Sequence, residues 1–138
     1  MKILGVDFGD SRTGYAISDA LGFGASVIPA FKSGNIKNVA EHTAALAKEL
    51  GAEKIVLGYP KNMNGTIGPR AEKTRRLVEI IKEFTDIPVV LWDERLTTVS
   101  AHNLMNETNI RGKKRKESVD SISAAYILQG YLDSLNQK

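Results

Sequence analysis

The spacing of hydrophobic and polar positions changes along the chain, and these changes delimit the expected elements. Short apolar runs at residues 2–8, 13–18 and 25–31 predict three strands, and the turn at residues 9–12 joins the first two. Pro29 in the third run is typical of an edge strand, because proline cannot donate a ladder hydrogen bond. We expect these strands to form an antiparallel meander, since their connections are short.

The apolar period becomes helical over residues 36–50. Asn35 is placed to cap the start of this helix, and Gly51 to end it. The apolar and small residues of one helical face are Ile36, Val39, Ala40, Thr43, Ala47 and Leu50.

Two later apolar runs, at residues 54–58 and 88–92, are continuous, which is typical of parallel strands covered on both faces. Helices are predicted at residues 71–84, 97–106 and 119–135. Right-handed crossovers would align both runs with the first strand, so we expect an α/β fold with one mixed sheet between helices. The inward face of the last helix would consist of Ala124, Ile127, Leu128, Tyr131 and Leu135.

The composition fits one globular domain over residues 1–138, with 42% hydrophobic and 25% charged residues. The chain has no cysteine and two histidines, which excludes a disulfide framework, a thiolate metal site and a histidine-built zinc site. Any metal would be bound by oxygen, which favours Mg²⁺ or Mn²⁺. Asp7 interrupts the first apolar run, and no segment is long enough to span a membrane, so we expect a cytoplasmic protein.

The net charge of +3 is concentrated in one segment. Without its five cations the rest of the chain would carry −2. A local basic patch favours a polyanionic partner such as nucleic acid, and the alternative is a solvated charged loop. We expect the segment to be a loop. Its cations are Arg111, Lys113, Lys114, Arg115 and Lys116.

Three carboxylates are expected to meet at one edge of the sheet. Asp7 ends the first strand and Glu94 follows the fifth, so their strand ends would be about 10 Å apart across the fourth strand. Asp120 would lie in the first turn of the last helix, four residues before Ala124 and on the same inward face. The start of a helix also favours an ionised carboxylate.

Such a cluster would bind one or two Mg²⁺ or Mn²⁺ ions and is typical of phosphoryl-transfer sites. Taken singly, Asp7 could be a turn residue, Asp120 a helix cap and Glu94 part of a surface ion pair. Asp93 could replace Glu94, because strand ends are predicted only to within one or two residues. The glycines near these acids, Gly5, Gly9 and Gly58, are expected to leave clearance for a metal or a phosphate backbone.

The polar segment after the fourth strand, residues 59–66, lies where α/β folds usually bind ligands. We expect its side chains to contact substrate phosphates together with Arg95 and the basic loop. The candidates in this segment are Lys61, Asn62 and Asn64.

The chain resembles the YqgF (RuvX-type) family of RNase H-like nucleases over nearly its whole length, and four segments carry the resemblance. They are G-V-D-F-G with G-Y-A-I-S-D-A-L-G, V-L-G-Y-P-K-N-M-N-G-T, D-E-R-L-T-T and S-V-D-S-I-S-A-A-Y-I-L-Q. The resemblance implies an RNase H-like fold with strand order 3-2-1-4-5 and an acidic triad of Asp7, Glu94 and Asp120. Many RNase H-like enzymes carry an acid at the end of strand four, where this chain has Gly58-Tyr59-Pro60, so the number of metals stays open.

The resemblance implies a metal-dependent nuclease that hydrolyses phosphodiester bonds in the 5′-end processing of pre-16S rRNA. Holliday-junction resolution is the alternative, because phosphates dominate affinity for RNA and DNA alike. We expect a monomer or weak homodimer, whereas resolution would need a dimer. Two further alternatives are an idle RNA-binding module and an ATP-binding phosphotransferase-like domain, which the D-F-G-x-x-x-x-G-Y-A hairpin resembles; one domain with one phosphate loop disfavours the latter.

Overall fold

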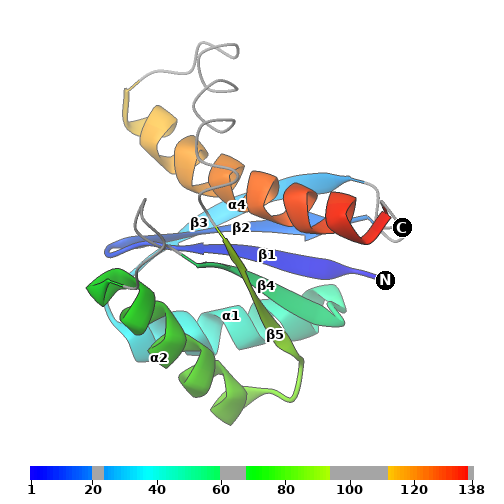
Figure 1. The fold of residues 1–138 in the computed structure, drawn as a ribbon. Coiled ribbons are helices and arrows are strands. Elements are labelled where there is room, and N and C mark those ends of the chain that lie inside the picture. Colours follow the sequence, from blue (N-terminus) through cyan, green and yellow to red (C-terminus); the bar gives the residue numbers. More distant parts are fainter. Residues whose placement is uncertain (20–23, 60–67, 94–111, 137–138) are drawn as a thin grey trace.

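A computed structural model of the chain describes residues 1–19, 24–59, 68–93 and 112–136. Their core is a five-stranded mixed sheet in the order β3-β2-β1-β4-β5 (Figure 1). β1 pairs antiparallel with β2 and parallel with β4; β2–β3 is antiparallel and β4–β5 parallel. The predicted order is therefore confirmed. The strands are β1 (Ile3–Phe8), β2 (Arg12–Ser18), β3 (Ala25–Lys32), β4 (Lys54–Tyr59) and β5 (Val89–Asp93).

Helices cover both faces of this sheet (Figure 1). α1 (Ile36–Leu50) and α2 (Pro69–Phe84) lie on one face, and α4 (Gly112–Asn136) lies on the other. The predicted ends of α1 are confirmed. The Asn35 side chain accepts a hydrogen bond from the Asn38 backbone N–H at 3.1 Å, and Gly51 ends the helix with a left-handed φ of 73°.

The alternation of each strand divides the core into two clusters, one on each face. On the α1 and α2 side, β1 contributes its even-numbered residues, Leu4, Val6 and Phe8. On the α4 side it contributes Ile3, which packs with Leu128 of the helix. Odd-numbered positions of β1 therefore belong to the face that α4 covers.

The last helix differs from the prediction. α4 begins at Gly112, seven residues before the predicted start, so residues 112–116 form its first turns and not a loop. Lysine and arginine are good helix formers, and this segment has no proline to stop them. Leu135, expected to face inward, is 43% exposed, and the buried face of α4 ends at Leu132.

The predicted helix at residues 97–106 lies outside the described residues. Within the described ranges, every helix is too short or too polar to cross a membrane.

Candidate active site at the carboxyl edge of the sheet

Asp7 lies near the carboxyl end of β1, the central strand of the sheet, opposite Gly14 of β2. Its neighbour on the same face is Gly5, where an added Cβ would lie only 2.7 Å from the Cβ of Leu128 in α4. Because side chains alternate along a strand, Asp7 also belongs to the α4 face. Asp7 is half-buried there, at the edge of the sheet.

The backbone of α4 brings residue 120 to the same level of the sheet. The Lys54 ammonium donates to the Tyr131 hydroxyl at 2.8 Å, and Lys54 pairs with Ile3 at the start of β1. Ala124 lies over Gly5, so α4 runs antiparallel to β1. Residue 120 precedes Ala124 by four residues, which is about 6 Å along the helix. This distance matches the advance of about 6.6 Å along β1 from Gly5 to Asp7.

The environment expected for Asp120 has to be corrected. It lies about two turns into α4, because the helix begins at Gly112. The favourable effect of a helix start on a carboxylate is confined to the first turn. The backbone of residue 120 therefore lies inside α4, four residues before the contact of Ala124 with Gly5, and not at the start of the helix.

The third proposed acid, Glu94, lies outside the described residues, one position after β5 ends. Val90 and Trp92 of β5 pack on the α4 side of the sheet. Even-numbered positions of this strand therefore belong to the α4 face. Trp92 pairs with Gly58 of β4, the strand that separates β5 from β1.

Two glycines expected to give clearance for a substrate have structural roles instead. At Gly5 an added Cβ would also meet the Ala124 carbonyl oxygen at 2.9 Å, so this glycine allows α4 to approach β1. At Gly9 it would lie 2.5 Å from the Arg12 carbonyl oxygen, which accepts a hydrogen bond from the Gly9 N–H at 2.9 Å. Gly9 is therefore required by the tight β1–β2 turn.

The structure adds two cations to this edge that were not among the predicted site residues. The Arg70 guanidinium donates to the carbonyl of Phe8, next to Asp7, at 3.4 Å. The Lys73 ammonium lies 5.6 Å from the centre of the Phe8 ring and 3.7 Å from a carboxylate oxygen of Asp10. Their sequence signal is the run of basic residues in the first turns of α2, just after the polar segment that follows β4.

Five of the remaining predicted substrate contacts lie outside the described residues: Lys61, Asn62, Asn64, Arg95 and Arg111. The other four, residues 113–116, lie in the first turns of α4.

The oxygen donors of this edge suit a hard divalent cation. Asp7 supplies a half-buried carboxylate, and residue 120, another carboxylate, lies at its level. Such donors fit Mg²⁺ or Mn²⁺ better than a softer metal. Among the side chains that the structure describes, no three potential ligands come together. A complete site would thus need the carboxylates of residues 94 and 120 in addition to Asp7.

Comparison with known proteins gives a consistent result over the whole chain. The family model described as RuvX, Holliday junction resolvase, matches residues 1–134. A protein of Clostridium tetani is 48% identical over 138 residues, all of each chain, and one of Bacillus licheniformis is 45% identical over 139 residues, 99% of each. Each is named "Putative pre-16S rRNA nuclease".

Solved structures share the fold at low sequence identity. RuvC of T. thermophilus, in complex with a Holliday junction substrate, has a TM-score of 0.64 and 10% identity, covering 99% of this chain and 97% of its own. The fowlpox virus resolvase, in complex with substrate Holliday junction DNA, has a TM-score of 0.58 and 18% identity, covering 98% and 99%. These similarities confirm the predicted RNase H-like fold.

Proposed function

The chain belongs to the RuvX family, and from this membership we propose that it is a metal-dependent nuclease that processes the 5′ end of pre-16S rRNA. The observation that carries the proposal is the position of Asp7 on the α4 face of the central strand, at the level of residue 120. Relatives that match the chain end to end and are named for this reaction support the choice of substrate.

In this proposal Asp7, Glu94 and Asp120 hold Mg²⁺ or Mn²⁺. When bound, such a cation lowers the pKa of a water molecule and stabilises charge on the reacting phosphate. Glu94 is preferred over Asp93 as the third acid, because even-numbered positions of β5 face α4. The packing of α4 against Gly5 supports this pairing, because it would keep residue 120 at the level of Asp7 before substrate binds.

The cations would bind the phosphates on either side of the cleaved bond. Arg70 and Lys73 lie on the α2 side of the sheet edge, and residues 113–116 lie in the first turns of α4 on the other side (Figure 1). Contacts to phosphates position a nucleic acid without reading its sequence. Substrate held from both faces would place its backbone across the end of β1, next to Asp7.

Holliday-junction resolution is a second candidate function. It is supported by the description of the family and by the shared fold with two resolvases over nearly the full chain. A resolvase must make paired nicks and therefore needs two active sites on one junction. A protein that stays monomeric on a four-way DNA junction and leaves it intact would exclude this candidate.

The test is a cleavage assay on a pre-16S rRNA fragment with its 5′ extension and, in parallel, on a four-way DNA junction. We expect cleavage of the RNA with Mg²⁺ or Mn²⁺ and none with EDTA. Asp7→Asn should reduce the rate at least about 100-fold, because it replaces a charged metal ligand by a neutral, weaker one. Asp86→Asn is the matched control, since Asp86 is exposed in the connection between α2 and β5.

Cleavage that survives both EDTA and Asp7→Asn would contradict the proposed site. A gel-shift measurement with the same RNA shows whether the variant still binds. If the protein is an idle RNA-binding module, the wild type and the Asp7→Asn variant would both bind the RNA, and neither would cleave it.

A further inference from the structure

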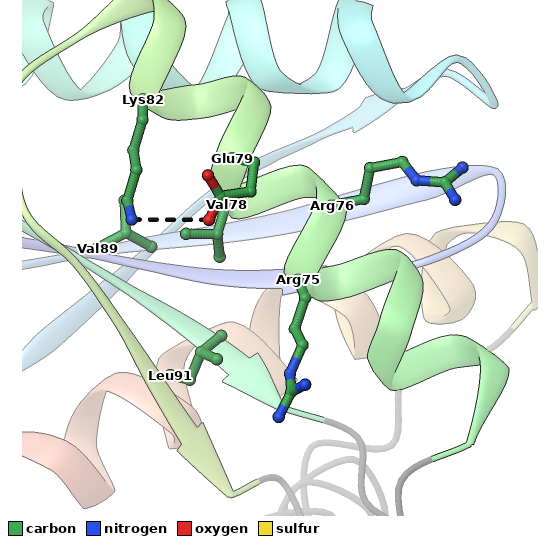
Figure 2. A pocket seen from close by; sticks show the side chains of 7 residues that line it. All are labelled: Arg75, Arg76, Val78, Glu79, Lys82, Val89 and Leu91. Carbon is green, nitrogen blue, oxygen red and sulfur yellow. Dashed lines mark ion pairs between the residues drawn. The ribbon is translucent and has the colours of Figure 1, made fainter.

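A second surface lies on the other face of the sheet from α4, between α2 and β5 (Figure 2). It is a groove of about 510 Å³, and it runs along an edge strand of the sheet. Its lining residues are Arg75, Arg76, Val78, Glu79, Lys82, Val89 and Leu91. None of the proposed metal ligands is among them, so the groove calls for a separate explanation.

The floor of the groove is aliphatic. Val89 and Leu91 of β5 are half-buried and pack against the core cluster on the α2 side, and Val78 of α2 lies beside them. Residues two apart in a strand are about 6.6 Å from each other on one face. A second extended chain has the same repeat, so its alternate side chains could contact Val89 and Leu91 in turn.

The rim of the groove is basic. Figure 2 shows Lys82 beside Val89 and Arg75 on the side of Leu91. The two cations are seven residues apart on α2, which is about 10 Å along the helix. Glu79, between them, lies 3.8 Å from Lys82, and three cations against one acid leave the rim positive.

The edge of β5 supplies a third property. Within the described part of the chain, β5 pairs with β4 alone, so its outer edge has no neighbouring strand there. The backbone groups of such an edge are a template for an added strand. Peptides bind in this way to many sheet edges, with backbone hydrogen bonds for affinity and alternate side chains for specificity.

We propose that this groove binds an extended acidic peptide segment of a partner protein, which pairs with the outer edge of β5. Apolar side chains at alternate positions of the segment cover Val89 and Leu91, and its carboxylates bind Arg75 and Lys82. A nucleic acid fits less well. None of the lining residues is aromatic, so bases have no ring to stack on, and Glu79 repels phosphates.

The test uses a synthetic peptide, Glu-Thr-Val-Thr-Val-Thr-Glu with blocked ends, added to the isotope-labelled full chain and followed by backbone amide NMR. We expect shifts confined to the amides of β5 and of the facing side of α2. The double variant R75E/K82E should bind this peptide about 10-fold more weakly and should gain binding of the same peptide with lysine in place of glutamate.

Two further variants separate charge from packing. Lys2→Glu changes charge on an exposed side chain just before β1, which β4 separates from β5, and should leave the affinity unchanged. Val89→Thr keeps the shape of the floor but makes it polar, and should weaken binding severalfold. Unchanged amide spectra outside the groove show that each variant is folded.

Absence of shifts at β5 even at millimolar peptide would overturn the proposal. A ten-nucleotide oligouridine that shifts these amides when the peptide does not would assign the groove to RNA. Concentration-dependent shifts at β5 without peptide, together with a dimer in sedimentation, would assign the edge to a second copy of the chain. None of these results depends on catalysis, so the proposed function can fail independently.

Discussion

Gly5 and Asp7 are two residues apart on β1 and share one face, yet the structure uses them for different purposes. Gly5 lies under α4, where the absence of a side chain lets the helix approach the strand. Asp7 lies further along, at the carboxyl edge of the sheet, where its carboxylate is half-buried. The difference arises from where α4 crosses the strand.

A histidine remote from the proposed triad gives a prediction for stability against pH. His42 of α1 stacks on Phe31 of β3 with ring centres 4.0 Å apart and an angle of 5° between planes. Burial lowers the pKa of His42, and Glu49 offsets part of this change. The unfolded chain thus binds this proton more readily than the native protein, and stability should decrease as pH falls below about 6.5.

His42→Phe keeps a ring against Phe31 and removes the titrating group. Urea unfolding at about pH 7.5 and about pH 5.5 should show a larger loss of unfolding free energy in the wild type than in the variant. At the higher pH, His42 is neutral in both states and contributes no pH dependence. Equal losses in the two proteins would contradict the assignment.

At the scale of elements, α4 links the packing of the core to the geometry of the proposed site. It packs on β1, β2 and β3 with Ala124 and Leu128 over Gly5, and it carries Asp120 one turn before this contact. A displacement of the helix should therefore change stability and cleavage together.

Gly5→Ala tests this coupling. The new methyl group would lie 2.7 Å from the Leu128 Cβ and 2.9 Å from the Ala124 carbonyl oxygen, so α4 has to move. We expect a loss of about 1–3 kcal/mol in the free energy of unfolding, as is usual for overpacking. Cleavage, measured where the variant is still fully folded, should also fall.

Gly34→Ala is the control for this substitution, because its nearest contact, the Asp10 carbonyl oxygen, would be at an ordinary 3.5 Å. This variant should keep both stability and activity. A Gly5→Ala protein with normal stability would show that α4 can adjust without cost. Normal cleavage by a destabilised variant would show that the proposed site does not depend on the position of α4.

At the scale of the whole molecule, the arrangement of charge predicts how binding depends on salt. Arg70 and Lys73 lie against the end of β1, and the basic segment begins α4 on the other face of the sheet. Each cation that contacts a phosphate releases about one counterion on binding. The affinity for RNA should therefore fall steeply as salt increases.

Removing two of these contacts should weaken that dependence. For Arg70→Gln/Lys73→Gln, we expect lower RNA affinity and a slope of log affinity against log salt that is smaller by about 2. Lys2→Gln/Lys48→Gln removes the same charge at exposed positions and should leave the slope unchanged. An unchanged slope in the first variant would place the RNA backbone elsewhere.

The order of strands and helices follows from local patterns. Alternation, the helical period and caps such as Asn35 and Gly51 involve residues close together in the chain, so the predicted bounds of β1 to β5, α1 and α2 agree with the structure to within two residues. The predicted start of α4 was wrong, because a run of lysine and arginine suits a solvated loop and a helix equally well. We also propose that residues 1–138 form one domain.

The residues around the site show what local patterns leave open. The sequence identified Asp7 and Glu94 through their strand ends, Asp120 through its place on the last helix, and all three through the family resemblance. The contact of Arg70 with Phe8, 62 residues away in sequence, and that of Gly5 with Leu128 depend on which elements pack together. Only the tertiary structure decided these contacts and the groove between α2 and β5, because each joins surfaces whose separate sequences carry no sign of the partner.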